Sequence, residues 1–163
     1  MTSDSIRATV AILTKDSERT LDRALRSVSG FAEILVCDGG STDKTRAIAA
    51  EAGARVLTQE PRFLDENGRI RDFGGERNQT LAAATNDWFL FLDSDEYLSD
   101  ELLEEIRATV ATHAPAAFWV PRIYVHKGER IDCASTYPRP QMRLFNQTVA
   151  GSFIKEVHER IVL

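Results

Sequence analysis

The chain has 163 residues, of which 43% are hydrophobic and 28% charged, and its net charge at pH 7 is -5. This length predicts one globular domain over residues 1–163 with a sizeable core. The negative charge argues against general nucleic-acid binding, and no run approaches the roughly 18 apolar residues that span a membrane.

Strand-like and helix-like patterns alternate along the first 115 residues. Runs of apolar and β-branched residues predict four strands, at 8–14, 32–38, 54–59 and 88–93. Helical spacing of apolar residues predicts four helices, at 17–28, 42–53, 75–85 and 99–113. We expect Ser17 or Asp16 to cap the first helix, Gly53 to stop the second, and the charged stretch 60–74 to be a loop. This alternation predicts an α/β fold whose mostly parallel sheet is covered on both faces.

The pattern changes after Pro115. Residues 116–132 predict a hairpin that turns at Lys127-Gly128, as a small mixed or antiparallel addition. The two cysteines, Cys37 in an apolar run and Cys133 in a polar stretch, follow no disulfide pattern. They indicate a reducing compartment, and with no apolar signal segment in residues 1–10 we expect the cytoplasm.

Three of the four predicted strands run into a cluster that contains Asp together with Ser, Thr, Lys or Glu. These ends read Thr14-Lys15-Asp16, Asp38-Gly39-Gly40-Ser41-Thr42-Asp43 and Asp93-Ser94-Asp95-Glu96. Ligands in parallel sheets bind beyond the carboxyl ends of the strands. We therefore expect the three ends to line one cleft.

The last of these ends is the most acidic. Asp93 and Asp95 follow the apolar run 88–92 and can both turn toward one cation. Mg²⁺ and Mn²⁺ prefer oxygen ligands, and Mg²⁺ is commonly held by one or two carboxylates together with substrate phosphates. A metal–diphosphate site is one interpretation. The alternative is that these acids simply begin the next helix.

The stretch VCDGGSTDKT predicts a tight strand–turn–helix connection. Gly39 and Gly40 permit a positive φ, and Ser41 or Thr42 can cap the helix that follows. Turn formation explains these residues but not Asp38, whose carboxylate could accept a hydrogen bond from a nucleobase N–H or a ribose hydroxyl. The glycines do not form G-x-G-x-x-G after the first strand, which disfavours a nicotinamide dinucleotide.

Four segments together carry a family resemblance: ATVAILTKDSERTLDRALRSV, ILVCDGGSTDKT, GGERNQTLAAATNDWFLFLDSDE and VHERI. In this order they resemble family 2 glycosyltransferases of the GT-A fold, and more narrowly the bacterial enzymes that add glucose or related sugars to the lipopolysaccharide core. The resemblance runs from about residue 7 to the end of the chain. It implies nucleotide binding by Thr14 and Asp38, a basic Arg77-Asn78 pair near the nucleotide, Asp93 toward ribose and metal, Asp95 on the metal, and a functional His158-Glu159 pair.

The resemblance also implies the reaction. A hexose would pass, with inversion, from a nucleotide diphosphate sugar (a UDP-sugar by resemblance) to a hydroxyl of a saccharide or lipid-linked acceptor in the cell envelope. Mg²⁺ or Mn²⁺ on Asp93 and Asp95, with His158 completing the shell, would neutralise the leaving diphosphate. We assign the general base to Glu159, with Asp132 as the rival, and expect His158 and Glu159 in a loop or at a strand end.

Several alternatives stay open. Arg77 on a charged helix could be solvated, and Arg139 and Arg143 could meet diphosphate or acceptor charge or only water. The chain stops four residues after Glu159, whereas members of the family run on with segments that cover the acceptor side or contact membrane. We therefore carry a truncated, inactive nucleotide- or partner-binding module as a second hypothesis, with peripheral membrane association and oligomeric state open. A phosphatase of the haloacid dehalogenase class is disfavoured because its D-x-D lies on the first strand.

Overall fold

The computed structural model describes residues 5–112, 114–131, 140–154 and 160–162. Its helices and strands follow one another as β1 (Ile6–Thr14), α1 (Leu21–Ser27), β2 (Phe31–Asp38), α2 (Thr45–Glu51), β3 (Arg55–Thr58), the 3-10 turn η1 (Pro61–Phe63), α3 (Phe73–Ala83), β4 (Trp88–Asp93), α4 (Asp100–Ala111), β5 (Ala117–Val120), β6 (Tyr124–His126), β7 (Glu129–Ile131), β8 (Gln141–Asn146), β9 (Phe153–Ile154) and β10 (Arg160–Ile161).

The central sheet has six strands in the order β3-β2-β1-β4-β8-β5. The first four of these strands pair in parallel, while β8 runs antiparallel to both β4 and β5. This arrangement confirms the predicted α/β class with a mostly parallel sheet and a mixed addition after Pro115.

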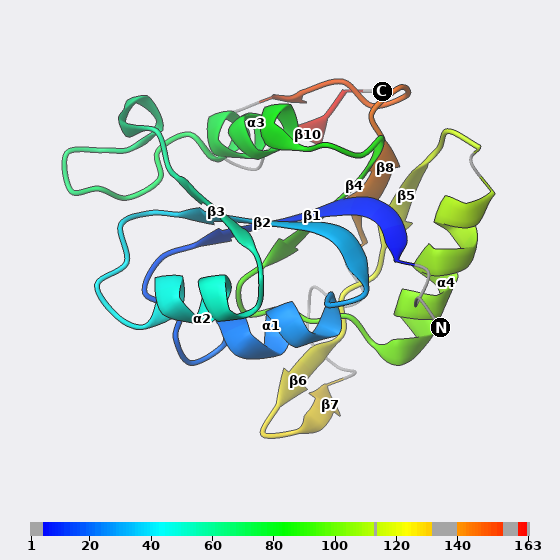
Figure 1. Ribbon diagram of the computed structural model, residues 1–163, viewed down its shortest axis with the longest axis horizontal. Coiled ribbons are helices and arrows are strands. Elements are labelled where there is room, and N and C mark those ends of the chain that lie inside the picture. The colour runs from blue at the N-terminus through cyan, green and yellow to red at the C-terminus, as the bar shows by residue number, and fades with distance from the viewer. Residues whose placement is uncertain (1–4, 113, 132–139, 155–159, 163) are drawn as a thin grey trace.

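Helices cover both faces of the sheet (Figure 1): α1 and α2 lie on one side, and α3 lies on the other beside β10. Successive strand residues point to opposite faces, and β1 and β4 use this alternation. Ile12 and Leu90 pack with Leu25 of α1 in one buried cluster. Ala11 and Phe91 belong to a second cluster on the α3 side.

The start of the first helix differs from the prediction. The helix begins at Leu21, because residues 17–20 form a turn in which the Ser17 carbonyl accepts the N–H groups of Thr20 and Leu21. Asp16 has a φ of 47° and its carboxylate accepts the N–H of Thr42 instead. The predicted cap by Ser17 or Asp16 is therefore wrong. Asp16 instead joins the loop after β1 to the loop after β2.

The region after Pro115 also differs in detail. The hairpin over 116–132 is two separate units, since β5 joins the main sheet and only β6 and β7 pair around Lys127 and Gly128. The predicted turn is confirmed, with φ values of 51° and 85° at these two residues. Strand β8 has no counterpart in the prediction, although it is the neighbour of β4. Among the described residues no helix has the length and apolar character to cross a membrane.

Candidate functional site

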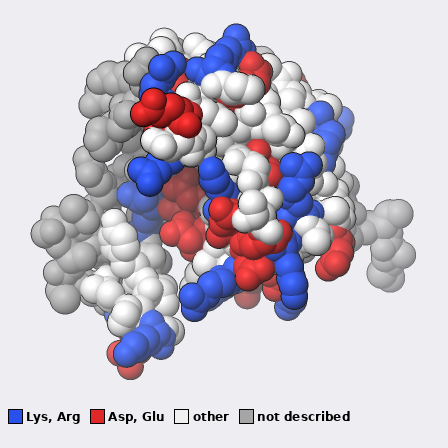
Figure 2. Space-filling model, turned by 90° about the vertical axis from the view of Figure 1, so that its left-hand side faces the viewer, with Lys and Arg blue, Asp and Glu red and all other residues white. Residues whose placement is uncertain are grey.

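Three strand ends meet at one edge of the sheet. Thr14 of β1 pairs with Asp38 of β2, and Leu13 of β1 pairs with Asp93 of β4. Figure 2 views the molecule from the left-hand side of Figure 1, the side toward which these strands run, and shows Asp and Glu side chains in a recess surrounded by Lys and Arg. The predicted convergence of the three polar ends is confirmed.

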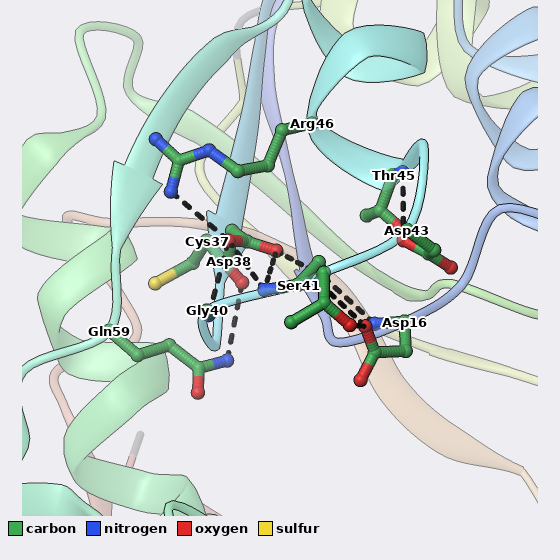
Figure 3. A network of polar contacts seen from close by, with 10 residues as sticks. Asp16, Cys37, Asp38, Gly40, Ser41, Asp43, Thr45, Arg46 and Gln59 are labelled. Atoms are coloured by element: carbon green, nitrogen blue, oxygen red, sulfur yellow. Dashed lines mark hydrogen bonds and ion pairs between the residues drawn. The ribbon is translucent and has the colours of Figure 1, made fainter.

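Asp38 is fully buried beneath the turn that follows β2. Its carboxylate accepts the N–H groups of Gly40 and Ser41 at 3.1 Å, and also the Ser41 hydroxyl. Arg46 of α2 approaches the same carboxylate at 3.3 Å (Figure 3). Asp38 therefore has a turn-building role in this structure, and its predicted contact with the nucleotide stays a prediction.

The two glycines of this turn serve different needs. Gly40 has a φ of 80°, a conformation that favours glycine. Gly39 is close to the Gln59 side chain, because a Cβ at this position would lie 2.7 Å from Gln59 Oε1. Gln59 in turn donates to the Cys37 carbonyl at 3.2 Å. Gln59, the residue after β3, therefore packs against this turn.

Side-chain oxygens join the loops after β1 and β2 to each other. Asp16 accepts the Thr42 N–H at 2.8 Å, and the Ser41 hydroxyl accepts the Asp16 N–H at 2.8 Å (Figure 3). The loop after β4 joins them through Ser17 and Ser94, whose hydroxyl oxygens are 3.1 Å apart. The edge is thus held by a network that links three strand ends.

Thr14 is 4% exposed, at the centre of this edge. Its hydroxyl oxygen is buried and has no hydrogen-bond partner within the described part of the chain. A buried hydroxyl without a partner is costly. Thr14 therefore has hydrogen-bonding capacity to offer to a ligand, in keeping with its predicted place at the nucleotide.

Asp93 lies between two arginine side chains. Arg77 Nη2 of α3 is 3.1 Å from Asp93 Oδ1, and Arg143 Nη2 of β8 is 3.1 Å from Oδ2. Both guanidinium groups stack over Phe91, with centroid distances of 4.1 Å and 4.5 Å. Burial raises the pKa of Asp93, but the charges of Arg143 and Arg77 outweigh it, so the pKa lies below its ordinary value of 3.8.

Both arginines are buried, at 6% exposed for Arg77 and 4% for Arg143. The interpretation of Arg77 as a solvated side chain is therefore wrong. Arg143 also contacts Glu96 at 3.0 Å, and Arg122 approaches the same Glu96 oxygen at 3.5 Å. Sequence reasoning left Arg143 undecided and did not select Glu96 or Arg122. A prediction of β8 as a strand would have pointed to Arg143. Adjacent residues of a strand face opposite sides of the sheet, so Arg143 lies on the face opposite to the buried Leu144.

Asp95 is exposed on the turn after β4, and no residue in the described ranges bonds to its carboxylate. Among these residues, no three His, Cys, Asp or Glu side chains form a group that could hold a metal ion. The Asp95 carboxylate fits a hard divalent cation, whereas both Asp93 oxygens are paired with arginine. His158, the third predicted ligand, lies outside the described residues.

Glu76 is a buried acid that sequence reasoning did not select. It is fully buried on α3, and its Oε2 lies 3.6 Å from the Cys37 thiol. Its Oε1 has no hydrogen-bond partner in the part of the chain that the structure describes. Burial raises the pKa of Glu76 to about 7; the Cys37 hydrogen bond opposes this and the charges of Glu60 and Asp72 add to it. Burial likewise raises the pKa of the Cys37 thiol.

Asn78, the partner of Arg77 in the family pair, binds backbone. Its amide nitrogen donates to the Phe153 carbonyl at 2.9 Å, and its oxygen accepts the Phe153 N–H at 2.8 Å. A cavity of about 330 Å³ lies beside these residues, lined also by Phe63 and Gly75. Asn78 thus ties α3 to β9.

The predicted acceptor-side residues fall outside the described ranges. They are the predicted base Glu159 and its rival Asp132; His158, predicted as a metal ligand, and Arg139, left open between diphosphate, acceptor and water, also lie outside these ranges. Strands β9 and β10, which flank residues 155–159, pair with each other through Ile154 and Arg160.

Comparison with known proteins gives the family. The family model described as "Glycosyl transferase family 2" matches residues 9–155. An uncharacterized glycosyltransferase of Rickettsia bellii is 31% identical over 158 residues, which are 93% of this chain and 51% of that protein. A TPR repeat-containing protein of Synechococcus elongatus is 38% identical over 76% of this chain and 29% of its own length. The chain thus spans about half of the first of these curated relatives and less than a third of the second.

Solved structures give the same result. The structure of S. aureus TarS 1-349 in complex with UDP-GlcNAc has a TM-score of 0.53 and 26% sequence identity, covering 66% of this chain and 32% of that one. The same TarS fragment in complex with UDP superposes equally well, with a TM-score of 0.53. These findings favour the glycosyltransferase over the phosphatase hypothesis. With the family model matching most of its length and the polar strand ends gathered as that family's motifs imply, the chain belongs to glycosyl transferase family 2.

Proposed function

We propose that this domain binds a nucleotide diphosphate sugar, most simply a UDP-sugar, and transfers its hexose with inversion to an acceptor hydroxyl. The observation that carries the proposal is the alignment of Thr14, Asp38 and Asp93 on three neighbouring parallel strands. Support for uridine comes from TarS, which was solved with UDP-GlcNAc and with UDP. A saccharide or lipid-linked acceptor of the cell envelope rests on the motif resemblance alone.

In this proposal each residue at the edge has one task. Thr14 offers its unpaired hydroxyl to the nucleotide, and Asp38 accepts a hydrogen bond from base or ribose. Asp95, with Asp93 and His158, would hold Mg²⁺ or Mn²⁺, which when bound neutralises charge on the diphosphate. Glu159 would take the acceptor proton as the hydroxyl attacks carbon 1 of the sugar.

Calorimetry with UDP, with and without Mn²⁺, tests the donor and metal parts of this proposal. We expect Mn²⁺ to tighten UDP binding and Asp95→Ala to remove that gain while the fold survives. The Asp93 carboxylate is paired with Arg77 and Arg143, so Asp95 gives the cleaner test. An unchanged affinity of Asp95→Ala in Mn²⁺ would refute the metal assignment.

A sugar-nucleotide hydrolysis assay then separates the enzyme from the binding module. Release of free sugar from a UDP-sugar, dependent on Mn²⁺, supports transfer. Tight UDP binding with no turnover of any sugar nucleotide, with saccharide and lipid-linked acceptors supplied, would instead support the inactive binding module.

A further inference from the structure

Two buried side chains join α3 to β2 directly behind the sheet edge. Cys37 comes just before Asp38 at the end of β2. Glu76 comes just before Arg77 on α3. Both Cys37 and Glu76 are fully buried, and the Cys37 thiol donates to Glu76 Oε2 at 3.6 Å. A thiol–carboxyl contact therefore lies next in sequence to two residues that are predicted to bind the donor.

The Glu76 carboxyl group has little around it to balance a negative charge. The elements that pack against α3 are β1, β2, β9 and η1. The titratable groups that act on Glu76 are one thiol, two further acids and one arginine: Cys37 of β2, Glu60 before η1, Asp72 before α3 and Arg62 in η1. Ala11 of β1 and Phe153 of β9, on the same side of the sheet, do not titrate. Arg62 is already paired with Glu60 at 2.7 Å, and its side chain is 70% exposed.

The geometry of this contact favours a neutral carboxyl group. Glu76 Oε1 is buried and has no hydrogen-bond partner within the described residues. A buried charge without a partner is costly. Because the side chain is fully buried, water can reach it only if α3 and β2 move apart.

A movement of α3 would reach the sheet edge at once. Arg77, the residue after Glu76, contacts Asp93 Oδ1 at 3.1 Å. Asn78, the next residue, exchanges two hydrogen bonds with the backbone of Phe153. The charge state of Glu76 is thus connected through its own helix to the end of β4.

We propose that Glu76 is a positioning residue: its protonated form holds α3 against β2, and release of the proton weakens donor binding at the sheet edge. The inference rests on the proposed function, since the ligand is the same donor. Burial raises the pKa of Glu76 to about 7, so donor affinity should be highest at acidic pH and fall as the pH rises through about 7. Because proton and donor favour the same arrangement, each strengthens the binding of the other.

The test compares UDP affinity at fixed Mn²⁺ in the wild type and in Glu76→Gln, which is neutral at every pH. UDP and the other groups of the protein titrate in both experiments, so the ratio of the two affinities isolates Glu76. If only the protonated form binds, about one tenth of the wild type is competent at about pH 8, since the pKa is about 7. The wild-type dissociation constant should therefore rise about tenfold relative to the variant between about pH 6 and about pH 8.

A second measurement counts protons. At about pH 8, UDP binding to the wild type should take up about one proton more than UDP binding to Glu76→Gln. Calorimetry in two buffers of different ionisation enthalpy measures this number. A side chain that only supported the fold would change affinity without changing proton uptake.

Two further variants make the result decisive. Cys37→Ala removes the thiol, whose hydrogen bond lowers the pKa of Glu76, so the fall in affinity should move to higher pH. This variant also covers the case in which Glu76→Gln does not fold. Glu33→Gln is the matched control, because Glu33 lies on the same strand and accepts from Thr9 at 2.6 Å, but near the start of β2. Its pH profile should equal that of the wild type.

Hydrogen exchange without ligand measures the position of α3 directly. Relative to the amides of β1, and after correction for intrinsic exchange rates, protection of the α3 amides should fall with rising pH in the wild type and stay constant in Glu76→Gln. Equal pH profiles, proton uptake and α3 protection in the two proteins would overturn the inference and leave the proposed function standing. If the wild type binds no UDP, the proposed function fails instead, and hydrogen exchange still decides whether Glu76 holds α3.

Discussion

Asp38 has a structural role in the turn after β2, and the proposed function gives the same carboxylate a second role. The structure has it fully buried, accepting the N–H groups of Gly40 and Ser41. The family resemblance implies that the same residue binds the nucleotide. The two oxygens can accept about four hydrogen bonds, and Gly40, Ser41 (through its N–H and its hydroxyl) and Arg46 already supply four donors, so a nucleotide group would have to displace one of them.

Asp38→Ala should therefore change two measurements. The free energy of unfolding should fall by about 1–3 kcal/mol, because turn N–H groups lose their partner. Uridine affinity without metal should also fall, by about 1.5–3 kcal/mol if the contact involves the charged group. Ser41→Ala is the control, since it removes one hydroxyl from the turn and leaves the carboxylate. Uridine affinity at the wild-type level in folded Asp38→Ala would leave only the turn-building role.

Glu76 gives the molecule a pH dependence that can be isolated. Burial raises its pKa to about 7 from an ordinary value of 4.5, so between these values the folded protein holds a proton that the unfolded chain releases. Its stabilising contribution is therefore complete below pH 4.5 and is lost as the pH rises through about 7. The charged groups around it are Glu60, Asp72 and Arg62, with the Cys37 thiol against its carboxylate.

Glu76→Gln should remove this contribution while keeping size and hydrogen bonding. Relative to the wild type, the variant should gain about 3 kcal/mol of unfolding free energy between about pH 4.5 and about pH 8. Urea unfolding of both proteins at the two pH values measures this difference, and the lowered pKa values of Asp93 and Glu33 cancel because both proteins contain them. A pH-independent difference would mean that Glu76 titrates normally.

At the scale of elements, α3 and β8 complete an edge that the parallel strands begin. Helix α3 supplies Arg77 to Asp93 and Asn78 to the backbone of Phe153. Strand β8 supplies Arg143 from the neighbouring antiparallel position. Helix α3 also packs tightly against η1, because a Cβ at Gly75 would lie 2.3 Å from the Phe63 ring. These contacts fix α3 between Asp93 at the end of β4 and Phe153 of β9.

The β9–β10 pair flanks the segment that contains the predicted base. Glu159→Gln keeps size and hydrogen bonding but removes the base, so turnover should fall roughly 10²–10⁴-fold while UDP-sugar affinity stays near wild type. His158→Ala should instead weaken Mn²⁺-dependent donor binding. Near-normal turnover of Glu159→Gln with the true acceptor would place the base elsewhere, and Asp132→Asn would be the next variant to assay.

At the scale of the whole molecule, the negative net charge does not describe the sheet edge, where several arginine side chains gather. The chain has a net charge of -5, yet Arg77, Arg122 and Arg143 gather from three distant segments at one edge of the sheet. Net charge therefore does not by itself argue against the proposed diphosphate ligand, because the field at a site is set by the local charges. Figure 2 shows this mixture, with basic side chains around the acidic recess.

The sequence by itself determined the parallel half of the fold and the edge where the site lies. Strand β4 has the predicted bounds, 88–93, and the other predicted strands and helices are present with shifted ends. The physical reason is that hydrophobic periodicity and turn chemistry are local properties of the chain. Once the strands are parallel, their polar ends must share one edge, which places Thr14, Asp38 and Asp93 side by side.

The tertiary structure alone decided what these carboxylates contact. Arg143 reaches Asp93 only because β8 inserts beside β4 across a separation of 50 residues, a pairing that no local pattern encodes. The burial of Glu76 on a short, polar helix likewise depends on β2 and its Cys37 packing against that helix. Antiparallel register and burial are set by non-local packing, and they determine which acids are paired with arginine, which are protonated, and which remain available to a ligand.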